Sequence, residues 1–175
     1  MNKRQEELLL EYLSQIPESY RRMFRILAEF AAELGYVPVR CKTKDLTMNF
    51  KCSRTKKTIM KMEVKEQAHE GFRCGEREMP GLRLKFFAVE DYSGIYQRGV
   101  QHVIEAFFGK YTGCYGCGRC EGKPQGYVFQ YPDGREVFRC GSELIPIFNF
   151  DEENIAEIQR LLSAQAAYFE TERIP

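Results

Sequence analysis

The sequence predicts an α+β fold: a mostly antiparallel sheet with helices packed on one face, plus a small cysteine-rich zinc-type module. Apolar residues recur at helical spacing near both ends of the chain, whereas several middle segments alternate between apolar and polar residues. Strands and helices do not alternate regularly, which argues against a doubly wound parallel sheet. In addition, four of the seven cysteines fall within one glycine-rich stretch, which predicts the module.

The first part of the chain, residues 1–35, predicts two helices. Residues 3–13 place leucines and a tyrosine on one stripe, with charged residues outside it. A second helix is expected over 17–34. Pro17 suits a first helical turn because its missing N–H does no harm there, and Gly35 suits the position after the last turn.

Residues 45–108 predict most of the sheet. Residues 45–53 and 57–65 both alternate between apolar and polar side chains, which indicates a hairpin of two half-buried strands. Residues 82–90 carry apolar side chains on both faces. We therefore expect them to form a central strand, covered on both sides.

The sequence predicts no specific function for two histidines and one cysteine in this part of the chain. The polar stretch 66–81 is expected to be a loop, and it contains His69 and Cys74. A helix is expected over 94–108, where His102 stands among polar residues. A histidine in that setting is expected to lie at the surface or pack against a neighbouring element.

Residues 110–145 predict a metal-binding module built around a second hairpin. Its strands are expected at 126–131 and 135–139, joined by a Pro-Asp-Gly turn. This hairpin would return the chain to the point where it began. The predicted metal ligands, three at C-x2-C-x2-C spacing and a fourth after the hairpin, are Cys114, Cys117, Cys120 and Cys140.

Zinc is the predicted cofactor, because four thiolates in a tetrahedron are a preferred ligand set of structural zinc sites. Such full ligation leaves no open position for water or substrate. Two cysteines separated by two residues bind one ion only if the backbone turns tightly, and glycine accepts the positive φ of such turns. The glycines within and after the cluster are Gly113, Gly116, Gly118, Gly122 and Gly141. The site would carry a net charge of about −2, and the cations expected to offset it are Arg119, Lys123, Arg135 and Arg139.

An iron–sulfur cluster and a thiol redox centre remain open as alternatives. C-x2-C-x2-C also opens the bacterial ferredoxin motif, but Pro124 stands where that motif has its fourth cysteine, so Cys140 would have to serve as a remote ligand. In a thiol redox protein, Cys117 and Cys120 would form the exchanging C-x-x-C pair.

A zinc-knuckle nucleic-acid binder is a further alternative, which the sequence does not favour. Such a protein stacks bases on aromatic rings and neutralises phosphates with basic side chains. The opposing interpretation is that the aromatic residues pack a module that has little other core. The interleaved residues are Tyr111, Tyr115, Tyr127, Phe129 and Tyr131 with Lys110, Arg119, Lys123 and Arg135.

Length and composition favour a single soluble domain over residues 1–175, ending in a helix at 151–169. The chain is 43% hydrophobic and has 26 basic and 25 acidic residues, so its net charge of +1 gives no general attraction to nucleic acid or membrane. No apolar run approaches the roughly 20 residues of a membrane span. The odd number of cysteines and the absence of a secretory signal favour reduced thiols in the cytoplasm.

Enzymatic activity is not favoured, and catalytic residues stay unknown. The sequence contains no nucleophile elbow, no H-E-x-x-H, no P-loop and no dinucleotide-binding fingerprint. We therefore expect a binding or regulatory role, with an unidentified small molecule or protein as partner.

Several short segments carry a resemblance to a known family. They are Tyr12-Leu13 with Pro17-Glu18, Met79-Pro80, Phe86-Phe87-Ala88-Val89, and Gly94-Ile95-Tyr96 leading to Ala106-Phe107. Together they resemble the YdhG-like domains, small bacterial proteins with a frataxin-like α+β fold. The resemblance covers residues 12–108 and omits the cysteine cluster, and the 45–64 hairpin fits the family's spacing poorly. It implies an α+β fold with a small-molecule or scaffold role, and it supplies no catalytic residues.

Overall fold

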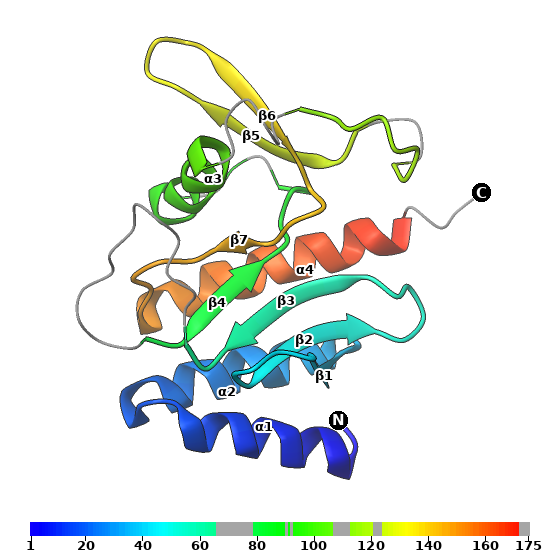
Figure 1. Cartoon of the computed structure of the whole chain (residues 1–175), viewed down its shortest axis with the longest axis vertical. Helices are drawn as coiled ribbons and strands as arrows, with labels where there is room; N and C mark the ends of the chain where they lie inside the picture. The colour runs from blue at the N-terminus through cyan, green and yellow to red at the C-terminus, as the bar shows by residue number, and fades with distance from the viewer. Residues whose placement is uncertain (66–78, 90, 92, 107–112, 121–123, 172–175) are drawn as a thin grey trace.

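The computed structural model describes residues 1–65, 79–89, 91, 93–106, 113–120 and 124–171 (Figure 1). In sequence, two helices precede the first strand and one helix follows the last strand. In order, the elements are α1 (Lys3–Gln15), α2 (Glu18–Glu33), β1 (Tyr36–Arg40), β2 (Thr47–Cys52), β3 (Thr58–Glu63), β4 (Gly81–Leu84), α3 (Gly94–Ala106), β5 (Gly126–Gln130), β6 (Glu136–Cys140), β7 (Ile145–Pro146), the 3-10 turn η1 (Glu152–Asn154) and α4 (Ile155–Thr171).

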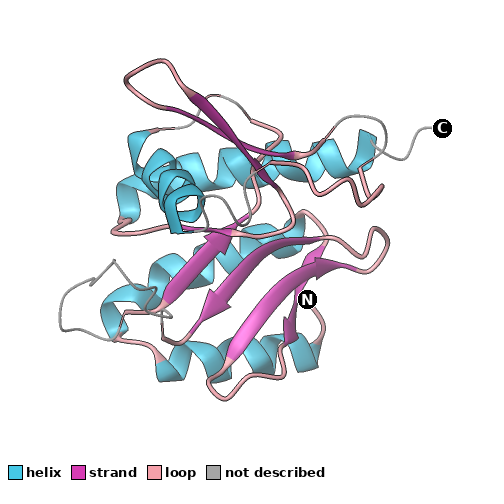
Figure 2. Ribbon diagram, turned by 45° about the horizontal axis from the view of Figure 1, so that its top comes forward, coloured by secondary structure: helices cyan, strands magenta, loops and turns pink. Residues whose placement is uncertain are grey.

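The main sheet has five strands in the order β1-β2-β3-β4-β7, and every neighbouring pair is antiparallel (Figure 2). The strands β5 and β6 form a separate two-stranded sheet. The chain leaves the main sheet after Leu84 and rejoins it at Ile145, which pairs with Leu84. The described residues between these two, including α3 and the four cysteines of the cluster, therefore lie outside the main sheet.

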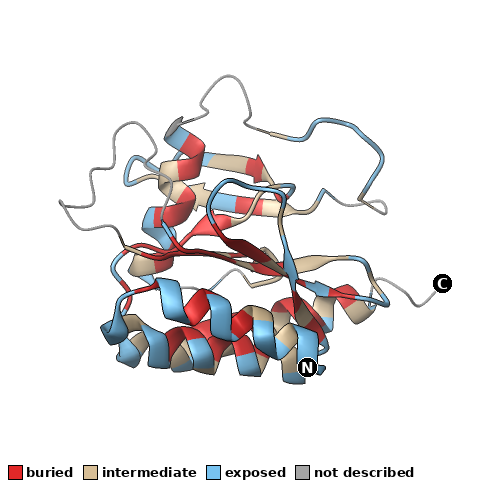
Figure 3. Cartoon of the chain, turned by 60° about the horizontal axis from the view of Figure 1, so that its bottom comes forward, coloured by how far each residue is buried: buried red, intermediate tan, exposed pale blue. Residues whose placement is uncertain are grey.

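Helices cover both sides of the sheet, so the predicted α+β class is confirmed but its finer arrangement is not. Figure 3 shows α1 and α2 on one side, with α3 and the β5–β6 hairpin on the other. The expectation that all helices share one face is wrong for α3, which starts after the chain has left the sheet and packs its Gly99 against the carbonyl of Pro146. None of the described helices combines the length and apolar character that crossing a bilayer requires.

The N-terminal helices lie close to where the sequence predicts them. The first begins with a capping box, in which the Asn2 side chain accepts from the Gln5 amide at 3.0 Å and the Gln5 side chain accepts from the Asn2 amide at 2.8 Å. The sequence predicts that α2 begins at Pro17, but the helix begins at Glu18 and Pro17 is its N-cap. Gly35 follows the helix with a φ of +84°, a conformation that side chains rarely adopt, which confirms it as the stop.

The strands differ from the predictions mainly at their ends. The predicted hairpin is confirmed as β2 and β3, and β4 is an interior strand as expected, although the residues beyond Leu84 leave the sheet. The edge strands β1 and β7 were not predicted, because each contains a proline, Pro38 or Pro146, and proline in a short segment argues against a strand. Proline is tolerated at a sheet edge, where one side of the backbone needs no partner.

One face of the sheet is apolar and forms the core. Cross-strand pairing aligns Met48 with Met62, and Phe50 with Met60 and then Leu84. All five side chains are fully buried. Since burying such a side chain stabilises the fold by about 1.5–3 kcal/mol, this face supplies much of the driving force that holds the helices on the sheet.

The opposite face carries a buried charge cluster centred on Glu63. This side chain is 2% exposed, and its carboxylate lies 2.7 Å from the Lys61 ammonium and 2.8 Å from the Arg83 guanidinium. Burial raises the pKa of Glu63, but hydrogen bonds and charge from Lys61 and Arg83 outweigh it, so the pKa lies below its usual value. The Tyr12 hydroxyl donates to the Glu63 carbonyl at 3.2 Å, which ties α1 to the same strand.

Candidate metal centre

The second predicted hairpin is confirmed as β5 and β6. The strands pair from Gly126 opposite Cys140 to Gln130 opposite Glu136, and Gly134 occupies the turn with a φ of +83°. The predicted start at 135 moves to Glu136, and the second strand includes Cys140. The hairpin therefore carries Cys140 back to the base from which β5 starts, as the sequence predicts.

Cys120 lies at the same base. The amide of Gln125 donates to the Cys120 sulfur at 3.4 Å, and the carbonyl of Gln125 accepts from the Gly141 amide at 2.9 Å. One residue thus contacts Cys120 through its N–H and the neighbour of Cys140 through its C=O. This arrangement connects the end of the cysteine cluster to the end of β6.

Cys114 approaches the hairpin from the other side. The Gly113 amide donates to the Phe138 carbonyl at 2.7 Å, and Gly113 forms a parallel bridge with Arg139. Cys114 is the next residue, so it runs beside the last part of β6. The amide of Gly116 donates to the Cys114 sulfur at 3.4 Å.

The glycines of the cluster are used in two different ways. Gly113, Gly116 and Gly118 have φ values of +81°, +62° and +68°, so the expectation that tight turns require them is confirmed. Gly122 lies outside the described residues. Gly141 has no positive φ, and it is needed for a different reason: a Cβ there would lie 2.7 Å from the Phe87 ring.

The four cysteines are all described, and each is a free thiol. Cys114 and Cys117 are exposed, whereas Cys120 and Cys140 are partly buried. Within the described parts of the chain, no three His, Cys, Asp or Glu side chains are grouped so that they could hold a metal ion. The convergence of all four sulfurs on one ion therefore stays a prediction.

One cation that interacts with the two partly buried cysteines, Cys120 and Cys140, was not predicted. Burial and the neighbouring Lys57 ammonium hold the pKa of Lys85 below its usual range, and the charges of Cys140 and Cys120 act in the opposite direction. The Lys85 amide donates to the Ile59 carbonyl at 2.8 Å, which fixes this residue against β3. The sequence feature that could have indicated this residue is the position of Lys85 within the largely apolar segment LRLKFFAV.

Two of the arginines expected to offset a metal site have other contacts. Arg139 is 1% exposed, lies 2.8 Å from the Glu143 carboxylate and donates to the Tyr115 hydroxyl at 3.4 Å. It thus joins the cysteine loop to the turn that follows Cys140. Arg135 lies 4.2 Å above the Tyr131 ring at the far end of the hairpin. Arg119 is exposed, and Lys123 lies outside the described residues.

The aromatic residues of the module are mostly occupied in packing. Tyr127 is 1% exposed, and its ring centroid lies 5.6 Å from that of Phe86. Phe129 packs edge-to-face on Tyr131, whose hydroxyl donates to Glu105 at 3.2 Å. Three of the rings proposed for base stacking are therefore engaged within the protein. Tyr115 is 49% exposed, and Tyr111 lies outside the described residues.

Of the two histidines, the structure describes only His102. His102 packs edge-to-face on Phe148 with ring centroids 5.5 Å apart, as expected for a histidine that packs against a neighbouring element. His69 lies outside the described residues, as does Cys74.

No protein-family model, curated protein or solved structure matches this chain. The resemblance to YdhG-like domains accordingly stays a prediction.

Proposed function

We propose that the chain is a zinc-binding α+β protein whose metal site is structural and whose role is binding or regulation. Cys114, Cys117, Cys120 and Cys140 would hold the ion as thiolates. Zinc bound in this way cross-links chain segments and leaves no open coordination position. The resemblance to YdhG-like domains, with its small-molecule or scaffold role, points to the same class of function.

The observation that carries the proposal is the hydrogen bonding at the hairpin base. Gln125 contacts Cys120 and the residue after Cys140, while the bridge of Gly113 brings Cys114 alongside β6. Three of the proposed ligands therefore belong to segments that hydrogen bonds already join, through the Cys120 sulfur in one case and through the backbone in the others. Because no three of these side chains are grouped in the structure, binding a metal would require both the Cys114 and the Cys117 side chains to move toward Cys120 and Cys140.

The chemistry of the surroundings also suits a charged thiolate site. Lys85 interacts electrostatically with Cys120 and Cys140, and it is partly removed from solvent. The module is small, and its largest buried side chains, Tyr127 and Arg139, contact the rest of the protein or the following turn. A small module of this kind gains folding free energy directly from a structural metal.

The test is elemental analysis of protein purified under reducing conditions, with matched cysteine variants. We expect about one zinc per chain, and Cys117→Ser and Cys140→Ser should lose the zinc and lower the melting temperature. Cys41→Ser is the control, because Cys41 is a partly exposed cysteine outside the module. Cluster variants that keep both the metal and the melting temperature would refute the proposal.

The same preparation separates the alternatives. An iron–sulfur protein would be coloured and would contain iron and acid-labile sulfide. A thiol redox protein would contain no stoichiometric metal and would form a Cys117–Cys120 disulfide under mild oxidation, which peptide mass spectrometry detects. Nucleic-acid binding would appear in a gel-shift assay at low salt and weaken as salt rises.

A further inference from the structure

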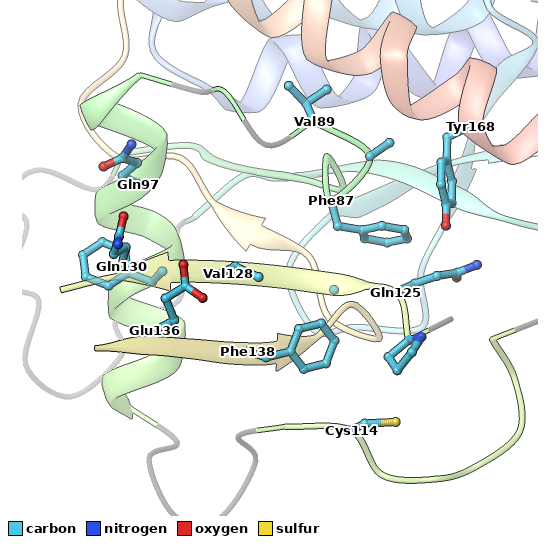
Figure 4. Close-up of a pocket in the computed structure, with 14 residues that line it drawn as sticks. Phe87, Val89, Gln97, Cys114, Gln125, Val128, Gln130, Glu136, Phe138 and Tyr168 are labelled. Carbon is cyan, nitrogen blue, oxygen red and sulfur yellow. The ribbon is translucent and has the colours of Figure 1, made fainter. Parts of the chain in front are cut away.

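A groove of about 910 Å³ lies along the more exposed face of the β5–β6 hairpin and the elements beside it (Figure 4). Its walls come from four parts of the chain: the segment after β4, helix α3, the hairpin and helix α4. Cys114 lies at one side of it. The volume falls within the range of about 300–1,000 Å³ that small-molecule sites occupy.

One end of the groove is aromatic. Phe87 and Tyr168 lie next to each other above β5, with ring centroids 5.7 Å apart in an edge-to-face contact, and Phe138 projects from β6 on the other side (Figure 4). All three rings are partly exposed. The Phe138 ring lies against the backbone of Gly126, where a Cβ would come within 2.6 Å of it. The glycine thus sets the position of this wall.

The other end is polar and carries one negative charge. Gln97 from α3 lies near Gln130 and Glu136, which are paired across the hairpin (Figure 4). Among the described residues that line the groove, Glu136 provides the single carboxylate, and there is no lysine or arginine. The Glu136 side chain is exposed at the rim.

From this arrangement we infer that the groove binds an aromatic amine, a flat ring system of one or two rings that bears a protonated amine on a short chain. The ring would lie against Phe138, at the end of the groove that Phe87 and Tyr168 also line, where aromatic partners contribute beyond simple burial. The amine would lie at Glu136, with the amide oxygen of Gln130 as a further acceptor. An anionic ligand of the same shape would face Glu136 with no cation in the lining to compensate. This binding site adjoins the proposed metal site, since Cys114 lines the groove, but the proposed contacts with the amine and the ring use none of the cysteines.

The absence of tryptophan from the chain gives a direct assay. Tryptamine is the probe, because its indole fluorescence can be excited without a tryptophan background from the protein. We expect a saturable change in fluorescence as protein is titrated into tryptamine. Indole-3-propionate is the matched ligand control, since it keeps the ring and replaces the amine by a carboxylate, and we expect it to bind at least tenfold more weakly.

Two variants test the two ends of the groove. Glu136→Gln should weaken tryptamine about threefold to fivefold, the effect of one partly exposed charge pair, and should leave indole-3-propionate no weaker. Phe138→Ala should weaken both ligands by about tenfold. Glu153→Gln is the control, because Glu153 is an exposed carboxylate in η1 outside the groove lining.

Three results would overturn the inference: no saturable binding of tryptamine, equal affinity for the two indoles, or unchanged tryptamine affinity in Glu136→Gln. Circular dichroism melts establish that each variant is folded before its affinity is compared. If Phe138→Ala does not fold, Glu136→Gln and the comparison of the two indoles still decide the question. Zinc analysis of the same samples keeps the outcome separate from that of the metal site.

Discussion

Replacing Gly99 by alanine sets two physical effects of opposite sign against each other. Gly99 lies within α3, where alanine is favoured over glycine by about 0.5–1 kcal/mol because it restricts the unfolded chain. The structure places the helix so close to β7 that a Cβ at this position would lie 2.2 Å from the Pro146 carbonyl oxygen and 2.8 Å from Ile145 Cγ2. One neighbour is backbone, which cannot rotate away.

The packing cost should exceed the helical gain. Relieving the contact with Pro146 requires a movement of roughly 1.3–1.8 Å, since non-bonded heavy atoms prefer separations of about 3.5–4.0 Å. Overpacking of this kind costs about 1–3 kcal/mol. After the gain in helix propensity is subtracted, we expect Gly99→Ala to lower the free energy of unfolding by about 1–2 kcal/mol.

Urea denaturation followed by far-UV circular dichroism measures this difference. Gly94→Ala is the matched control, because the same substitution at the first residue of the same helix meets no atom within 4 Å. Gly94 variants should be as stable as the parent or slightly more stable. If Gly99→Ala is also as stable as the parent, the close packing of α3 on β7 is wrong.

Three further predictions follow from contacts described above. Glu63→Gln should lower stability by about 2–3 kcal/mol at neutral pH. Because folding holds the Glu63 pKa below its usual value, its contribution is present above about pH 4.3 and is lost as the pH falls below that; an acid titration of the variant should be flatter there, and an unchanged profile would contradict this. Gly126→Ala should destabilise the hairpin by about 1–3 kcal/mol, since its Cβ would lie 2.2 Å from the Arg139 carbonyl oxygen; thermal melts would show it, and a neutral effect would count against the pairing. Arg139→Met should lower the melting temperature and loosen the cysteine loop, measured as faster alkylation of the exposed thiols, whereas alkylation at the parent rate would mean that Arg139 does not hold the loop.

Much of the fold could be predicted because the local signals and the packed structure agree. The strands β2 and β3 alternate cleanly, since one face enters the core and the other does not. The α2 helix is bounded by a proline and by a glycine with positive φ. At these positions, turn chemistry and hydrophobic pattern give the same answer.

The misses have a common cause, which is long-range contact. Two edge strands, β1 and β7, contain proline and are recognised only through the strands that they pair with. The side of the sheet on which α3 lies depends on how Gly99 fits against Pro146, a contact across 47 positions that no local pattern encodes. Sequence periodicity cannot report such tertiary preferences.

At the candidate metal centre, spacing predicted a set of ligands, which stays a prediction, but not their surroundings. The two short strands and the Pro-Asp-Gly turn predicted the hairpin that ends at Cys140, which the structure confirms. The interaction of Lys85 with Cys120 and Cys140 depends on the path of the chain where it leaves the sheet after β4. The surroundings of Arg139 depend on the turn that contains Glu143. Both are consequences of three-dimensional packing between segments that are distant in sequence.

The pairing of Leu84 with Ile145 means that the whole excursion between them begins and ends at adjacent points of the main sheet. A segment whose ends meet in this way can be exchanged or lengthened without moving its host, as happens when domains are inserted into one another. The cysteine module therefore has the topology of an insertion into the meander formed by β1, β2, β3, β4 and β7. Chemical damage to its thiols should leave the helices and strands of residues 3–63 folded, so that the protein would lose a function before it lost its shape.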